Sequence, residues 1–101
     1  MITYEVSEKN YNTIHKYIVR NSRNKPLCPI EEIDIQVNNS KYVVFFIFDK
    51  KRKIHLLYAL ESIKHFEYKY ITDSDVLMSL FKLLEMQIIN EETDKVQAVQ
   101  F

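Results

Sequence analysis

Glu67 and Lys69 flank Tyr68 in a segment whose alternating pattern predicts a strand. Glu-x-Lys on a strand is half of the site of metal-dependent nucleases, in which paired carboxylates hold Mg²⁺ and a lysine orients the attacking water. Asp34 or Asp49 would have to supply the second carboxylate. Because the same spacing arises on any strand with one polar face, a nuclease ranks third among the functions that we consider.

Basic side chains point to a second kind of chemistry, the binding of phosphate groups. Residues 1–30 carry five basic and two acidic side chains, whereas residues 61–101 carry four and eight. A basic hairpin beside the basic end of a helix would form a nucleic-acid-binding surface from eight residues: Lys16, Arg20, Arg23, Lys25, Lys50, Lys51, Arg52 and Lys53. Nucleic-acid-binding domains usually carry positive net charge, so the formal net charge of zero makes this function the alternative.

Apolar residues extend around much of the helix that we predict from Thr72 or Asp73 to about Ile89. Four of them lie outside the face expected in the core: Met78, Leu83, Met86 and Ile89. Exposed apolar surface of this kind is typical of protein interfaces, and the aromatic strand before the helix adds to it. We therefore prefer a small non-catalytic protein-binding or regulatory module that binds a protein partner through these residues and associates as a homodimer.

The remaining reactive residues form no complete site. Glycine is absent from the 101 residues, which excludes glycine-based phosphate cradles and dinucleotide fingerprints. His15, His55 and His65 fall on different predicted elements, and none lies at metal-ligand spacing from Cys28. We therefore predict no catalytic residues, no metal and no cofactor.

The sequence also suggests where the protein works. The single cysteine, Cys28, cannot form an internal disulfide, and no apolar run approaches the roughly 20 residues of a membrane span. The first residues lack the pattern of a signal peptide. We expect a cytoplasmic protein without membrane contact, and the excess of Lys over Arg favours an AT-rich bacterium or phage as its source.

Length and periodicity predict the elements that must position these residues. One domain over residues 1–101 is expected, with 92–101 as a loose tail or terminal edge strand. The fold class is α+β, an antiparallel sheet of four to six strands with two helices packed on one face, in the order β-α-β-β-β-β-α-(β). Apolar spacing predicts strands over 2–6, 31–37, 42–48, 53–60 and 63–71 and helices over 8–21 and 72–89, with a helix over 61–67 as an alternative.

Two further expectations concern the faces of the sheet. The strand over 42–48 is apolar on both faces and should be covered on each side. A tight turn at residues 61–62 would place three aromatic residues of the next strand on one face: Phe66, Tyr68 and Tyr70. The helices should cover that face, because burying aromatic rings stabilises the fold more than burying the charges of Glu67 and Lys69.

Overall fold

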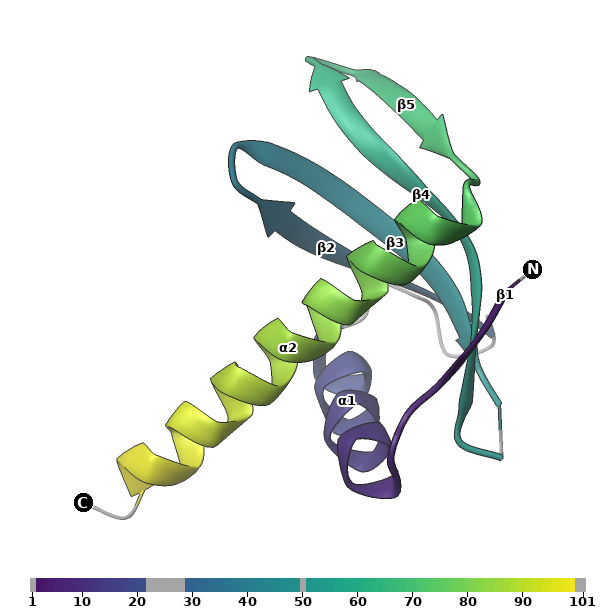
Figure 1. The fold of residues 1–101 in the computed structure, drawn as a ribbon. Helices are drawn as coiled ribbons and strands as arrows, with labels where there is room; N and C mark the ends of the chain where they lie inside the picture. Colours follow the sequence, from purple (N-terminus) through teal and green to yellow (C-terminus); the bar gives the residue numbers. More distant parts are fainter. Residues whose placement is uncertain (1, 22–28, 50, 100–101) are drawn as a thin grey trace.

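Alternating apolar residues pair into an antiparallel sheet, and two helices pack against one of its faces (Figure 1). The computed structural model describes residues 2–21, 29–49 and 51–99, with side chains as far as residue 93. The strands are β1 (Ile2–Glu5), β2 (Ile30–Val37), β3 (Ser40–Phe48), β4 (Lys53–Lys64) and β5 (Glu67–Ile71), and the helices are α1 (Glu8–Asn21) and α2 (Ser74–Val99). The predicted α+β class and element order are confirmed.

Short polar contacts fix the helix starts and the turns. Ser7 Oγ accepts a hydrogen bond from the backbone N–H of Asn10 at 3.2 Å, and Asp73 Oδ1 accepts two backbone N–H groups of α2 at 2.9 and 3.1 Å. These are the predicted helix caps. In the absence of glycine, the β2–β3 and β3–β4 turns place Asn38 (φ 55°) and Arg52 (φ 63°) in the left-handed region.

β4 is the strand on which the rest of the sheet is assembled. One edge of its 12 residues pairs with β3, and the other edge pairs first with β1 and then with β5. Ile2 lies opposite Leu56 and Ile71 lies opposite Ala59, so β1 and β5 divide one edge of β4 between them. The main order is β1-β4-β3-β2, which makes β3 a central strand as predicted.

A β-bulge in β4 changes which side chains face the helices. Phe46 of β3 pairs with Leu56, but its neighbour Phe45 pairs with Tyr58, so Leu57 is one extra residue on β4. Leu56 and Ala59 are therefore both buried beneath the helices although they are three residues apart. Tyr58 turns to the opposite face, which we call the outer face of the sheet.

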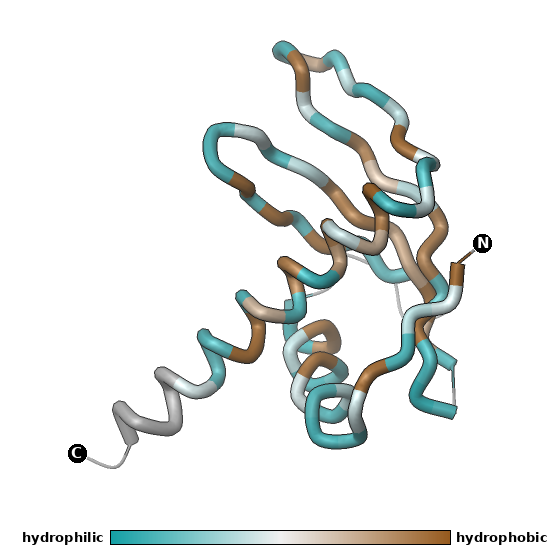
Figure 2. The backbone as a smooth tube through the Cα atoms, in the orientation of Figure 1, coloured by the Kyte–Doolittle hydropathy of each residue, from teal (hydrophilic) through white to brown (hydrophobic). Residues whose placement is uncertain are grey.

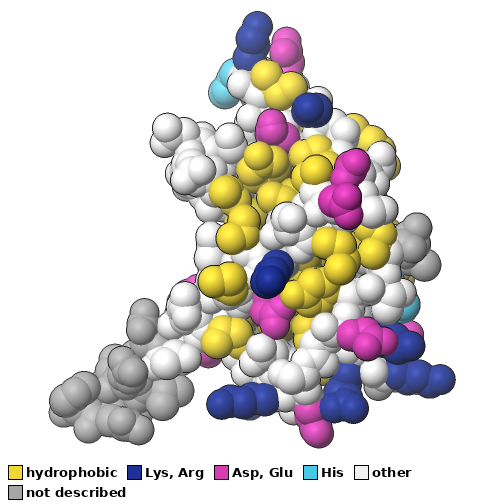
Figure 3. Space-filling model, viewed as in Figure 1, with side chains coloured by type: hydrophobic (Ala, Val, Ile, Leu, Met, Phe, Trp, Pro, Cys, Tyr) yellow, Lys and Arg dark blue, Asp and Glu magenta, His cyan; other side chains and the backbone are white. Residues whose placement is uncertain are grey.

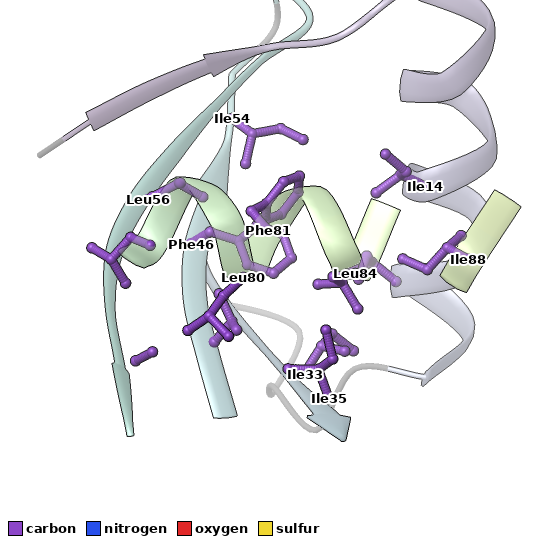
Figure 4. Packing of buried hydrophobic residues seen from close by; sticks show 14 residues of the cluster. Ile14, Ile33, Ile35, Phe46, Ile54, Leu56, Leu80, Phe81, Leu84 and Ile88 are labelled. Carbon is purple, nitrogen blue, oxygen red and sulfur yellow. The ribbon is translucent and has the colours of Figure 1, made fainter. Parts of the chain in front are cut away.

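α2 crosses the sheet and closes the core (Figures 1 and 2). The ring of Phe81 is buried, with its centroid 5.3 Å from that of Phe46 and 5.0 Å from that of Tyr4. Figure 4 shows Phe81 in the middle of the cluster, to which Ile54 of β4 and Ile14 of α1 also belong. Phe81 thus joins α2 to β1 and β3.

The structure corrects the predicted β4–β5 hairpin. The turn lies at His65 and Phe66, four residues after the predicted turn at residues 61–62, and residues 61–64 extend β4 without forming the alternative helix. Tyr68 and Tyr70 share one face as predicted, but that is the outer face, away from the helices. The bulge explains the difference. It turns Tyr58 and Leu60 of β4 to the outer face, and Tyr70 of β5 lies opposite Leu60 on that face.

Two further predictions about coverage and the C-terminal segment are wrong. β3 was expected to be covered on both sides, but among the described residues no helix covers the outer face, on which Val43, Phe45 and Ile47 remain half-buried. Residues 95–99 form neither a strand nor a loose tail, since α2 continues past Ile89 to Val99. Residues 100 and 101 lie outside the described residues.

Neighbouring phenylalanines on β3 test the difference between the two faces. Phe46→Ala should lower the free energy of unfolding by about 3–5 kcal/mol, because it opens a cavity in the core beside Phe81. Phe45→Ala should cost about 1–2 kcal/mol, since the outer face is only half-buried. Urea denaturation measures both values, and equal losses would contradict this assignment of the faces.

Glu85 of α2 holds the N-terminal elements in place. Its two carboxylate oxygens accept hydrogen bonds from the Tyr4 hydroxyl at 2.6 Å and from the Asn10 side-chain amide at 3.0 Å. Burial, followed by this hydrogen bond and the charge of Glu85, raises the pKa of Tyr4 to about 12. The Tyr4 hydroxyl therefore keeps its proton in the folded chain at pH values where an exposed tyrosine loses it.

The raised pKa of Tyr4 predicts a loss of stability at alkaline pH. In the unfolded chain this tyrosine ionises near its ordinary pKa of 10.0. The contribution of the protonated hydroxyl to the free energy of unfolding is therefore fully present below about pH 10 and is lost as the pH rises towards 12. Tyr4→Phe should flatten this part of the stability profile, measured by urea unfolding between about pH 8 and pH 11. An unchanged slope would show that the hydroxyl of Tyr4 does not titrate as described.

Candidate functional site

The outer face of the sheet carries a continuous group of aromatic side chains. The rings of Phe45 and Tyr58 stack with centroids 4.4 Å apart, and the Tyr58 and Tyr70 centroids are 4.9 Å apart. Tyr70 is 62% exposed, and Tyr68, two residues earlier on β5, is 56% exposed. We call these four residues the outer aromatic face: Phe45, Tyr58, Tyr68 and Tyr70.

Cross-strand pairing arranges this face in rows. Asp34 of β2 pairs with Val43 of β3, Val43 pairs with Leu60 of β4, and Leu60 pairs with Tyr70 of β5. The row therefore has a carboxylate at one end, two apolar side chains in the middle and a phenol at the other end. An open hollow of about 450 Å³ lies over this part of the sheet, with Tyr68 at its margin.

In the row nearer the hairpin tips, Gln36 of β2 pairs with Lys41 of β3, and Ser62 of β4 pairs with Tyr68 of β5. Here an amide stands at the β2 side and a phenol at the β5 side. Both rows therefore run from a hydrogen-bond acceptor on β2 to a hydroxyl donor on β5. This polarity matters for any partner that lies across the whole face.

The tip of the β4–β5 hairpin presents an apolar ring to solvent. Phe66 is 84% exposed and has a φ of 66°. A bulky residue is disfavoured in the left-handed region, where glycine or asparagine is more stable. Folding alone therefore does not explain a phenylalanine at this position, which lies next to the outer aromatic face.

The predicted partner-binding residues of α2 are on the surface, but they do not form one flat patch. Met78, Leu83 and Met86 are exposed, whereas Ile89 is half-buried in a hollow that Asn10 of α1 also lines. Met78 and Leu83 lie about 140° apart around the helix axis, because five residues make about 1.4 turns. Figure 3 shows the hydrophobic side chains on this side of the molecule interrupted by charged ones.

The predicted basic surface is divided between the two ends of α1. At the start of α1, Arg52 pairs with Glu8 at 3.5 Å, and Lys53 lies 4.0 Å from Glu5. At the other end, Arg20 forms an ion pair with Glu92 of α2, and Lys16 is exposed. Figure 3 shows basic and acidic side chains interleaved around the β3–β4 turn. Arg23, Lys25 and Lys50 lie outside the described residues.

The residues of the nuclease hypothesis are not brought together. Glu67 and Lys69 are exposed near the tip of the β4–β5 hairpin, on the face opposite to Asp34. Asp49 lies at the far end of β4, in the turn from β3. Among the described residues there is no group of three or more histidine, cysteine or acidic side chains that could hold a metal ion.

Asp49 instead takes part in a structural hydrogen-bond chain. It accepts the backbone N–H of Lys51 at 3.0 Å, and its other oxygen lies 3.1 Å from His55 Nε2, while Thr3 Oγ1 lies 3.2 Å from His55 Nδ1. The Lys51 hydrogen bond and then His55 hold the pKa of Asp49 below its ordinary range. These contacts tie the β3–β4 turn to β1.

The other histidines and the cysteine add no site. His15 packs its ring 5.1 Å from that of Phe48, and His65 lies in the hairpin turn 4.1 Å from the ring of Phe66. Cys28 lies outside the described residues. Sequence reasoning noted Tyr68 and Tyr70 but missed Phe45, whose place on the outer face depends on strand pairing.

Comparisons with protein-family models, with curated proteins and with solved structures find no match to this chain. In the part of the chain that the structure describes, no helix is both long enough and apolar enough to cross a membrane.

The β3–β4 turn can be tested for nucleic-acid binding. Changing Lys50, Lys51, Arg52 and Lys53 together to alanine should leave the fold intact, because the ion pairs of Arg52 and Lys53 are exposed and exposed ion pairs contribute little to stability. We expect no DNA or RNA binding at physiological salt, measured by fluorescence anisotropy. Binding by the unaltered chain that weakens steeply with salt and disappears in the fourfold variant would favour the nucleic-acid alternative.

Proposed function

We propose that this chain is a small non-catalytic protein-binding module that docks a protein partner through the outer aromatic face. The observation that carries the proposal is the group of contacting rings Phe45–Tyr58–Tyr70 on a sheet face that no described helix covers. We place the module in the cytoplasm, because its single cysteine requires no oxidising compartment. A regulatory role would follow from the partner that it binds.

The side chains of this face suit protein recognition. Tyrosine provides a large apolar ring and a hydroxyl at low cost in conformational entropy, and it is enriched among residues that dominate binding energy. Tyr68 and Tyr70 are more than half exposed in the isolated chain, so a partner has substantial ring surface to bury. Phe66 presents a further exposed ring at the hairpin tip, where its strained backbone favours a role in contact rather than in folding.

Charge favours a protein over a nucleic acid as the partner. By strand alternation, Glu32 and Asp34 of β2 stand on the outer face beside Lys41 of β3, so this face has no excess of positive charge. Stacking platforms for single-stranded nucleic acids combine aromatic rings with a positively charged groove. The exposed α2 residues Met78 and Met86 remain a second surface for comparison.

Capture of a partner from a lysate of the source organism tests the proposal with matched double variants. Tyr58→Ser with Tyr70→Ser removes two rings of the outer aromatic face, and Met78→Ser with Met86→Ser removes two exposed side chains of α2. We expect the tyrosine variant to lose at least about 90% of the captured protein, because central aromatic residues dominate interface energies. The methionine variant should keep it.

Circular dichroism and thermal unfolding should show that both variants are folded, since none of the four side chains belongs to the core. Loss of capture only in the methionine variant would move the binding surface to α2. Loss of capture after nuclease treatment, or no captured protein and no self-association at all, would contradict a protein-binding module.

A further inference from the structure

We propose that the partner on the outer aromatic face is a second copy of this chain, packed sheet on sheet about a two-fold axis parallel to the strands. This inference rests on the proposed function, because it uses the same surface. It is carried by the polarity of the rows across the sheet.

A two-fold axis that runs between β3 and β4 makes each row its own complement. It places Asp34 of one copy over the partner's Tyr70 and Val43 over the partner's Leu60, so a phenol hydroxyl meets a carboxylate and apolar side chains meet in the centre. A carboxylate has about four acceptor positions, so Asp34 can accept this hydroxyl in addition to the interaction that it already makes within its own chain.

The neighbouring rows fit the same axis. Gln36 lies over the partner's Tyr68, and Phe45 lies over the partner's Tyr58, which extends the stacked rings of each sheet across the interface. Sheets that pack face to face lie about 10 Å apart with strand directions within about 30°. A second sheet at that distance would also close the hollow at the hairpin end of this face.

A two-fold axis can also lie in the plane of the interface but perpendicular to the strands, and the charges of β2 disfavour that arrangement. An axis perpendicular to the strands would stack β2 on the β2 of the second copy, so Glu32 and Asp34 would meet like charges. Like charges brought together at an interface cost several kcal/mol. The acidic strand therefore selects the axis parallel to the strands.

The size of the face sets the strength of the dimer. Four strands about 4.8 Å apart and about six residues in length give a footprint of roughly 400 Å² for each copy. Two copies then bury roughly 800 Å², in the size range of weak and transient complexes. We therefore expect a dimer that dissociates at micromolar concentrations and not a permanent one.

Sedimentation equilibrium over about 1 µM to 1 mM tests the dimer and its surface. The unaltered chain should change from monomer to dimer across this range. Tyr70→Asp should weaken the dimer by about tenfold or more, because it faces the partner's Asp34 with a second carboxylate. Leu83→Glu on α2 is the matched control and should leave the dissociation constant unchanged.

Mixing two variants tests the axis itself. Asp34→Lys mixed with Tyr70→Asp should restore a dimer, since one contact becomes a lysine–carboxylate pair and the other stays as in the unaltered chain. Thermal unfolding of each variant shows beforehand that it is folded. If the mixture stays monomeric, or if Leu83→Glu dissociates the dimer and Tyr70→Asp does not, the proposed arrangement is wrong.

The two proposals fail in different ways. If the chain remains monomeric at about 1 mM, the upper limit of the titration, the proposed two-fold dimer is wrong. If the same chain still captures another protein and loses it on Tyr58→Ser with Tyr70→Ser, the outer aromatic face remains a protein-binding surface for a different partner.

Discussion

The packing of Phe81 against the sheet is the contact on which the rest of the structure depends. Its ring meets Phe46 of the central strand β3 and Tyr4 of β1, so one side chain of α2 joins strands that are not neighbours in the sheet. α1 packs mainly against α2 rather than against the sheet. A single long helix thus provides most of the cover, and within the described part of the chain it covers only one face. The open outer face follows directly from that arrangement.

The acidic residues of the C-terminal third and the basic residues of the N-terminal third contact each other in the fold. Two carboxylates of α2 hold the N-terminal elements: Glu85 accepts hydrogen bonds from Tyr4 and Asn10, and Glu92 pairs with Arg20. The acidic third of the chain therefore neutralises part of the basic third where they meet. Charges used in this way attach α2 to β1 and α1, whereas the outer aromatic face lies on the opposite side of the sheet.

Local signals in the sequence predicted the parts of the fold that local chemistry determines. The caps at Ser7 and Asp73 and the turn at Asn38 depend on side chains within a few residues, and all three form as expected. Neither glycine nor proline follows Ile89, so nothing in the sequence marks where α2 ends. Likewise His65 and Phe66 form a hairpin turn without a typical turn residue, and the predicted turn was placed four residues too early.

The bulge at Leu57 was beyond sequence reasoning because only pairing with β3 defines it. As a consequence, even-numbered residues (Ile54 and Leu56) face the helices in the first half of β4, whereas an odd-numbered residue (Ala59) does so in the second half. Regular pairing of β4 without the bulge would keep both halves in one phase and would turn Tyr58 and Leu60, instead of Ala59, towards α2. Losing the bulge without losing a residue would therefore disturb the core and the outer face together. As the protein diverges, β4 should therefore keep the bulge or lose it together with one residue, because both combinations leave the two surfaces unchanged.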